Sequence, residues 1–150
     1  MRLRGLTVLL VEDDLDNLEL MASYFDGEGA RTLSANSVVA ALAMTAVVRV
    51  DVIVSDLELM DGDGCALVSE LRQREGMQHV PAIAITGYSQ QKWRDKAMNG
   101  GFTRYAIKPF SLDTLVTWIA EVSGPAASGV RGEPSTAAET TQAGRDRLSQ

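Results

Sequence analysis

The chain has 150 residues, of which 45% are apolar, and this composition suits one globular domain with a hydrophobic core. Its formal net charge of −6 argues against nucleic-acid and membrane-surface binding, because proteins of those classes usually carry a basic patch. The single cysteine, Cys65, excludes an internal disulfide framework and favours a reducing, cytoplasmic location.

Apolar runs and amphipathic segments alternate along the chain. The runs predict five strands, at residues 6–11, 30–35, 50–55, 80–86 and 102–107. The segments that follow them predict five helices, at residues 15–25, 37–48, 63–75, 89–99 and 111–122. The first run is too short to span a membrane, and acidic residues follow it at once, unlike the cleavage site of a signal peptide.

Five consecutive strand–helix units predict an α/β domain over residues 1–123, a doubly wound, five-stranded parallel sheet with helices on both faces. Residues 124–150 contain no aromatic residue and few large aliphatic ones, so they are expected to form a disordered tail or a truncated linker. A short capping helix near the end of the chain is the alternative. With no second domain after residue 123, output would pass through a partner, a dimer or a longer parent protein.

Residues 56–64, with the sequence DLELMDGDG, place four carboxylates within nine positions. A calcium-binding EF-hand loop is excluded, because neither the register that begins at Asp56 nor the one at Asp61 puts glycine at position 6 and glutamate at position 12. Asp61 and Asp63 are expected to be turn and cap residues that lead into the third helix.

Polar residues follow four of the predicted strands directly. Because ligands of parallel sheets bind beyond the carboxyl ends of the strands, these residues are expected to form one site. The set consists of Glu12, Asp13 and Asp14 after the first strand, Asp56 after the third, Thr86 after the fourth and Lys108 after the fifth.

These residue types suit phosphoryl transfer. Carboxylates at short range repel one another unless a cation joins them, and magnesium takes hard oxygen ligands of this kind. Lys108 and Thr86 would stabilise the negative charge of a phosphoryl group. One carboxylate must then be the attacking group, and Asp56 is favoured because a buried, β-branched strand orients it.

Four motifs occur in the order and spacing of the response-regulator receiver domain: VEDD (11–14), VSDLELMDGDG (54–64), AITG (84–87) and RYAIKPF (104–110). The chain resembles that family over about residues 5–123. The resemblance implies the flavodoxin-like, CheY-like fold with strand order 2-1-3-4-5. It also implies a bacterial two-component phosphorelay.

The resemblance implies a role for each acidic residue of the site. Asp56 corresponds to the phosphoacceptor, and Glu12 and Asp13 correspond to the acidic pair, with Asp13 the direct ligand of Mg²⁺ or Mn²⁺. Glu58 matches a position whose backbone carbonyl binds the metal. The side chains of Glu58 and Tyr88 flank the path of attacking water in the family, and we expect them to tune dephosphorylation.

Thr86 and Lys108 match the family's phosphate-contacting pair, and Tyr105 matches the aromatic residue whose rotation accompanies switching. The bond between Lys108 and Pro109 is cis in the family. Met60 departs from the pattern, since proline is usual there, and it predicts a less rigid loop after Asp56.

The resemblance implies a signalling module rather than an enzyme with an external substrate. A sensor histidine kinase or a phosphotransfer protein would donate the phosphoryl group. A downstream protein or a second copy would bind the face of the fourth helix, fifth strand and fifth helix. Trp93, on the polar fourth helix, would mark that face if its ring were exposed.

Two other functions remain open from the residues. One is an interaction module of the same fold that binds partners without phosphorylation. The other is an aspartate-nucleophile phosphatase of the haloacid-dehalogenase type, which also uses an aspartate, a hydroxyl, a lysine and magnesium. Against the phosphatase, Glu58 stands where that class has a second aspartate, and the nucleophile follows the third strand rather than the first.

Overall fold

Five parallel strands form the central sheet of the computed structural model, which describes residues 1–124. Their order is β2-β1-β3-β6-β7, so the predicted order and parallel pairing are confirmed. The strands are β1 (Thr7–Val11), β2 (Arg31–Ala35), β3 (Val52–Asp56), β6 (Ala82–Thr86) and β7 (Arg104–Ile107).

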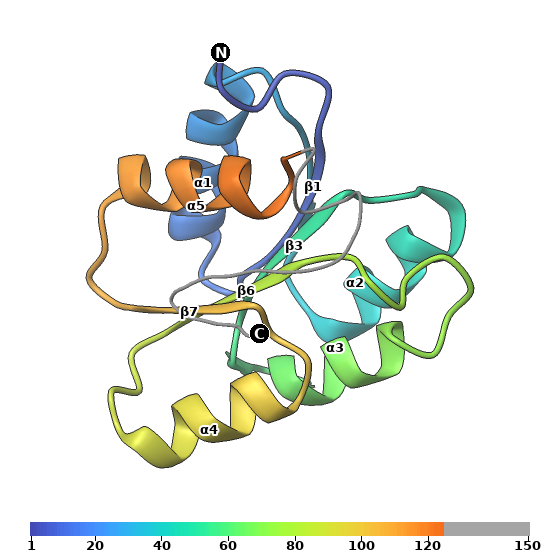
Figure 1. Cartoon of the computed structure of the whole chain (residues 1–150), viewed down its shortest axis with the longest axis vertical. Coiled ribbons are helices and arrows are strands. Elements are labelled where there is room, and N and C mark those ends of the chain that lie inside the picture. The colour runs from blue at the N-terminus through green and yellow to red at the C-terminus, as the bar shows by residue number, and fades with distance from the viewer. Residues whose placement is uncertain (125–150) are drawn as a thin grey trace. The chain divides into compact units, whose positions relative to one another are not determined.

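Five helices connect these strands and cover both faces of the sheet. In Figure 1, α1 and α5 lie on one face, and α2, α3 and α4 lie on the other. Each crossover places a helix against the sheet, as parallel connections require. The helices are α1 (Leu15–Gly27), α2 (Val38–Val47), α3 (Gly64–Leu71), α4 (Gln91–Asn99) and α5 (Leu112–Val122).

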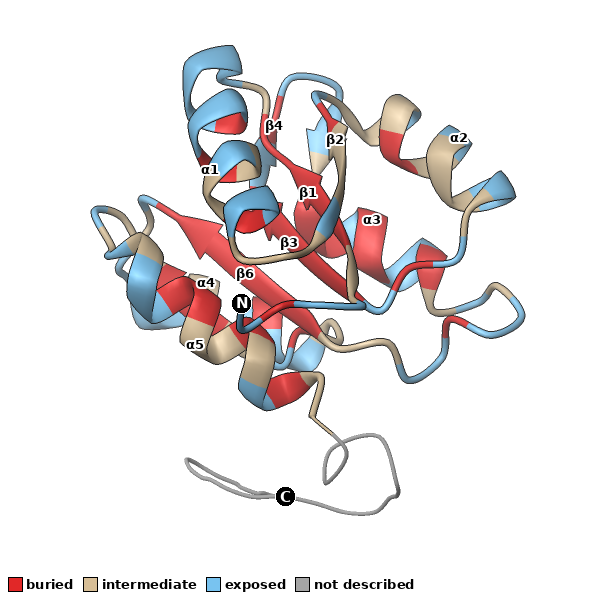
Figure 2. Cartoon of the chain, turned by 90° about the horizontal axis from the view of Figure 1, so that it is seen from above, coloured by how far each residue is buried: buried red, intermediate tan, exposed pale blue. Residues whose placement is uncertain are grey.

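The sheet supplies the centre of the core. All residues of β3 and β6 are buried, as the red strands in Figure 2 indicate. Side chains alternate between the faces, so Leu9 and Ile53 join the cluster formed with α2, α3 and α4. Residues Met1–Ile119 form one compact unit that holds the whole candidate site. Within residues 1–124, no helix is long and apolar enough to cross a membrane.

Several predicted boundaries are wrong by a few residues. The third helix was expected to reach residue 75 but ends at Leu71, where the i→i−4 bonds give way to i→i−3 bonds from Gln73 and Arg74. Gly76 then reverses the chain with a φ of +83°. The fourth helix begins at Gln91, two residues later than expected.

The acidic stretch after β3 forms a small antiparallel hairpin that the sequence did not predict. Its strands are β4 (Glu58–Leu59) and β5 (Gly62–Asp63), with Glu58 paired to Asp63. Asp63 caps α3 as expected, since its carboxylate accepts from the N–H of Ala66.

Asp61 lies in the turn of the hairpin, as expected, but it also caps a helix, which the sequence did not indicate. Its carboxylate accepts from the N–H groups of Val38 and Val39, at 2.8 and 3.0 Å, and so caps α2. These two hydrogen bonds hold the pKa of Asp61 below its usual value. These hydrogen bonds therefore anchor the hairpin to α2.

The first residues of the chain belong to the fold. Leu3 is fully buried, and its N–H donates to the carbonyl of Glu28. The guanidinium of Arg2 donates to the carboxylates of Glu28 and Asp113 and to the hydroxyl of Thr117. This network joins the chain start to the ends of α1 and α5. The expected tail, residues 124–150, lies outside the described residues apart from Gly124.

Candidate functional site

Three carboxylates meet at the carboxyl end of the sheet. Glu12 and Asp13 follow β1, and Asp56 is the last residue of the neighbouring strand β3. One oxygen of each lies within 4.8 Å of the others. Glu12 is 1% exposed and Asp56 is 6% exposed, so water screens their repulsion only weakly. The arrangement therefore calls for cations.

Lys108 supplies one positive charge. Its Nζ atom lies 2.7 Å from Oδ2 of Asp56 and 3.2 Å from Oε1 of Glu12. Burial alone would lower the pKa of Lys108, but the hydrogen bond and charge of Asp56, with the contribution of Glu12, raise it above its usual value. The lysine is thus held in its charged form between two buried acids.

Asp13 is the carboxylate without a cation. The second oxygen of Glu12 accepts from the N–H of Asp14, and Oδ1 of Asp56 accepts from the N–H of Glu58. In the described part of the chain, the Asp13 carboxylate has no such partner. Three hard oxygen donors with one lysine leave an excess of negative charge, and a magnesium or manganese ion fits this donor set.

Thr86 ends β6 beside Asp56. The two strands pair with Asp56 opposite Ile85, so Thr86 extends one residue further toward the acids. Its side chain is almost fully buried, and Oγ1 accepts from the N–H of Tyr88 at 3.1 Å. The hydroxyl is therefore positioned by the loop that follows β6.

Tyr105 lies on β7 with its ring turned into the protein. Only 6% of the residue is exposed. Its hydroxyl donates to the carbonyl of Tyr88 at 2.7 Å, and burial raises its pKa. The guanidinium of Arg94 lies 5.1 Å from the ring centroid.

The structure brings Glu58 and Tyr88 together. The hydroxyl of Tyr88 lies near the carboxylate of Glu58, and the interaction with this carboxylate is the main reason that the pKa of Tyr88 is raised. The negative charge of Asp56 contributes in the same direction. The side chains that the sequence placed on two separate loops therefore meet near the acceptor carboxylate.

Two backbone features shape the site. The peptide bond between Lys108 and Pro109 is cis. A Cβ atom at Gly64 would overlap the carbonyl oxygen of Asp56, so the first turn of α3 approaches the strand end as only glycine permits. Sequence reasoning missed Gly64, although its place directly after the acidic stretch was a usable signal.

Cys65 follows Gly64 in the first turn of α3. Its thiol is free and buried. Burial raises its pKa, and the charge of Asp63 acts in the same direction. The thiol is therefore unreactive in the folded protein.

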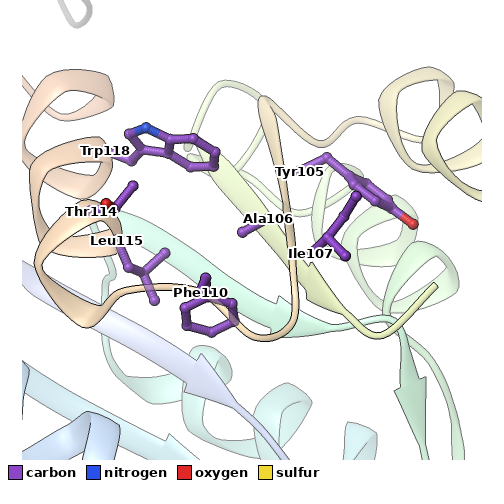
Figure 3. Close-up of a pocket in the computed structure, with 7 residues that line it drawn as sticks. All are labelled: Tyr105, Ala106, Ile107, Phe110, Thr114, Leu115 and Trp118. Atoms are coloured by element: carbon purple, nitrogen blue, oxygen red, sulfur yellow. The ribbon is translucent and has the colours of Figure 1, made fainter. Parts of the chain in front are cut away.

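A second feature lies on β7 and α5, away from the acids. A pocket of about 210 Å³ opens between the strand and the helix, and Figure 3 shows the ring of Phe110 beneath that of Trp118. The hydroxyl of Tyr105 points away from this pocket (Figure 3). Arg104 stacks over Trp118 at 5.5 Å. The lining residues are Tyr105, Ala106, Ile107, Phe110, Thr114, Leu115 and Trp118.

Comparison with known proteins identifies relatives by sequence. The family model described as the response regulator receiver domain matches residues 8–120. The polar-differentiation response regulator DivK of Brucella ovis is 27% identical over 120 residues, which cover 80% of this chain and 98% of the relative.

Solved structures share the fold. The receiver domain of the sensor histidine kinase PA1611 from Pseudomonas aeruginosa PAO1 is 28% identical, with a TM-score of 0.73, and the match covers 79% of this chain and 98% of that one. That structure has a magnesium ion coordinated in its active-site cleft. The chemotaxis response regulator CheY4 of Vibrio cholerae, at 24% identity and a TM-score of 0.74, covers 78% of this chain and 98% of its own, and supports the fold alone.

Proposed function

The chain belongs to the response regulator receiver domain family, and from this premise we propose that Asp56 accepts a phosphoryl group from a histidine kinase or phosphotransfer protein. The observation that carries the proposal is the position of Asp56. It ends a buried strand with one oxygen on Lys108, beside two further acids and a buried threonine hydroxyl. Such a carboxylate is oriented, charged and reachable from the strand ends.

Asp56, Lys108 and Thr86 would each have a separate role in phosphoryl transfer. An oxygen of Asp56 forms the new bond to phosphorus while the bond from phosphorus to the donor's imidazole nitrogen breaks, and the electron pair goes to that nitrogen. Lys108 moves its hydrogen bonds from the free carboxylate to the phosphoryl oxygens and offsets their charge. The hydroxyl of Thr86 donates to another phosphoryl oxygen.

Glu12, Asp13, Asp56 and the backbone carbonyl of Glu58 would hold Mg²⁺ or Mn²⁺. The bound ion would neutralise the charge that the phosphoryl oxygens bring to the acids. Asp13 is the first ligand we assign, because Lys108 already neutralises part of the charge of Glu12 and Asp56.

Phosphorylation would be transmitted through Thr86 and Tyr105. When Thr86 turns to the phosphoryl group, its Oγ1 bond from the N–H of Tyr88 changes, and the loop after β6 moves. The same loop accepts the hydroxyl of Tyr105 through the carbonyl of Tyr88. The two orientations of Tyr105 would therefore have different populations before and after phosphorylation.

The receiving surface would be the face of α4, β7 and α5. Its apolar pocket of about 210 Å³ includes Tyr105, so a change of that ring alters the pocket directly (Figure 3). A downstream protein or a second copy of the chain would bind there.

Glu58 and Tyr88 would tune the lifetime of the phosphoryl group. Their side chains lie near each other and near Asp56, where water would approach phosphorus. Replacing either one by alanine is expected to change the half-life of phosphorylated Asp56. An unchanged half-life in both variants would remove this part of the proposal.

The test uses a small phosphodonor such as acetyl phosphate with Mg²⁺, followed by intact-mass spectrometry. We expect one hydroxylamine-labile phosphoryl group per chain, absent in Asp56→Asn and without magnesium. Asp26→Asn is the matched control, because it makes the same substitution at an exposed position of α1.

Each alternative function gives a different result. Steady turnover of a small phosphate ester would indicate an aspartate-nucleophile phosphatase. Partner binding that is equal for the unmodified protein, the phosphorylated protein and Asp56→Asn would indicate an interaction module that works without phosphorylation. Either result would overturn the proposal.

A further inference from the structure

Trp93 is not the free, exposed ring that the sequence left open. It is half-buried on α4 and stacks on the ring of Tyr88, with the ring centroids 4.6 Å apart and the planes inclined by 20°. The Nζ atom of Lys96 lies 5.2 Å from the Trp93 centroid, on the next turn of the helix. An aromatic pair of this geometry stabilises the arrangement beyond the area that it buries.

The contacts continue from Lys96 and return to Tyr88. Nζ of Lys96 lies 4.0 Å from the carboxylate of Asp63, and Asp63 pairs with Glu58 across the small hairpin. The carboxylate of Glu58 lies near the hydroxyl of Tyr88, and this proximity completes the circuit. We call these five residues the clasp: Glu58, Asp63, Tyr88, Trp93 and Lys96.

The clasp joins the two loops that border the acceptor. The N–H of Glu58 donates to Oδ1 of Asp56, and the N–H of Tyr88 donates to Oγ1 of Thr86. Glu58 and Tyr88 therefore lie on the loops that hold Asp56 and Thr86, whereas Lys108 contacts Asp56 at its other oxygen, Oδ2. Glu58 and Tyr88 therefore flank the Oδ1 side of Asp56, from which a reagent can approach.

Phosphoryl transfer restricts the direction of that approach. The entering and leaving groups lie roughly in line through phosphorus, so attacking water and the leaving group of a donor use the same side of the phosphoryl group. During hydrolysis the water oxygen bonds to phosphorus, the aspartyl oxygen–phosphorus bond breaks, and the electron pair returns to the Asp56 carboxylate. An obstacle on this side slows hydrolysis and transfer from a small donor together.

We propose that Trp93 is a positioning residue that, by stacking on Tyr88, holds the Tyr88–Glu58 pair across the in-line approach to Asp56 and so slows both reactions. The inference rests on the proposed phosphorylation of Asp56. Trp93 touches no reacting atom and acts through Tyr88, and Lys96 and Asp63 support its ring from α4 and the hairpin.

The test compares three side chains at position 93. Trp93→Leu keeps apolar volume against the core but removes the aromatic stack, and Trp93→Phe restores a ring. In Trp93→Leu we expect hydrolysis and acetyl-phosphate transfer each to accelerate about two- to tenfold, the factor that corresponds to an aromatic pair. Trp93→Phe should return both rates most of the way, while Mg²⁺ affinity, measured by titration calorimetry, stays the same in all three.

A double-mutant cycle tests whether Trp93 acts through Tyr88. If it does, Trp93→Leu has no further effect on either rate in a Tyr88→Ala background. Lys96→Met should accelerate both reactions weakly. Lys92→Met is its matched control, because Lys92 also lies over Trp93, at 5.7 Å, but forms no ion pair with Asp63 within residues 1–124.

The two proposals fail in different ways. No phosphoryl group on wild-type Asp56 would remove the proposed function and, with it, this inference. A normal phosphoryl group whose lifetime is the same in wild type and Trp93→Leu would overturn the clasp alone. Full additivity in the double-mutant cycle, or a change in one rate without the other, would overturn it as well.

Discussion

Lys108 divides the three acids into two kinds. It contacts Asp56 and Glu12 directly, at 2.7 and 3.2 Å, and leaves Asp13 as a carboxylate with no cation in the described structure. Removing a charge from Asp56 would therefore disrupt an ion pair, whereas removing one from Asp13 would only relieve repulsion. The negative charge that has no nearby cation is therefore that of Asp13, which is also the residue assigned to bind the metal.

Asp13→Asn is expected to stabilise the metal-free protein by on the order of 1 kcal/mol, because it removes one of three carboxylates that lie within 4.8 Å. The same change should abolish most of the stabilisation that millimolar Mg²⁺ gives the wild type. Urea unfolding with and without Mg²⁺ measures both effects. Lower stability of Asp13→Asn without metal would contradict the charge assignment, and Asp16→Asn on α1 serves as the control.

The raised pKa of Lys108 predicts that the free energy of unfolding depends on pH in the alkaline range. Its pKa is raised above the ordinary value of 10.5, so its stabilisation is fully present below that value and is lost as the pH rises through the raised pKa. The difference in unfolding free energy between wild type and Lys108→Met should thus be constant near neutral pH and shrink above about pH 10.5. A difference that grows with pH over that range would refute the assignment.

The loop after β3 connects elements that are distant in the sequence. Asp61 caps α2 from 22 and 23 residues away, and Gly64 brings α3 against the carbonyl of Asp56. Movement of this loop is therefore shared by two helices. Met60, which is 88% exposed, is the part of the loop that has least contact with either of them.

Asp61→Ala is expected to loosen the first turn of α2. The amides of Val38 and Val39 lose their acceptor, so their hydrogen exchange should accelerate while amides in β3 keep their protection. Exchange measured by NMR at neutral pH resolves the two sets. In the wild type the same loosening should appear when acid protonates Asp61, below its usual value of 3.8, because its folded pKa is lowered.

Gly64→Ala is expected to destabilise the fold by about 1–3 kcal/mol, since the added Cβ overlaps the carbonyl oxygen of Asp56 and α3 must shift. The rate of phosphorylation by acetyl phosphate should fall as well, because Asp56 moves with its backbone. Gly27→Ala is the control, for a Cβ there meets no atom within 4 Å. Equal stability of the two variants would show that the contact is not restrictive.

The sequence predicted the elements whose signals are local. Buried runs such as β3 and the polar residues at the strand ends could be read directly, because the rule for parallel sheets brings Asp13, Asp56, Thr86 and Lys108 to one edge. Boundaries failed where a distant partner decides them. Just after α3, the guanidinium of Arg72 bonds to the carbonyls of Met77 and Gly101, a contact that no local pattern encodes.

The same reason explains what was missed in the site. The cap that Asp61 provides to α2 was missed because its partners are distant in the sequence, and the stack of Trp93 on Tyr88 depends on the angle between a loop and α4. Residue types and spacing predict which groups share an edge of the sheet. They do not predict which side chains on neighbouring loops contact one another.

The first residues of the chain cover the core at the end of the sheet opposite the site. Leu3 is completely buried, and Arg2 bonds to residues of α1 and α5. This role could not be predicted, because the first five residues precede any periodic pattern.

Leu3→Ala is expected to lower the free energy of unfolding by about 2–5 kcal/mol, as large-to-small changes at buried leucines do. Leu20→Ala on α1 is the matched control, since Leu20 is 59% exposed and its truncation should change stability by less than about 0.5 kcal/mol. Urea unfolding measures both. Equal effects of the two substitutions would mean that the chain start is not part of the cooperative unit.

The buried thiol of Cys65 can report how often the first turn of α3 opens. It is the chain's single cysteine, it sits in the first turn of α3 next to Gly64, and burial keeps it protonated and covered. A maleimide reagent can therefore modify the protein only during moments when that turn separates from the sheet. The labelling rate therefore measures the frequency of this local opening. It can show how phosphorylation changes local opening beside Asp56, without an engineered probe.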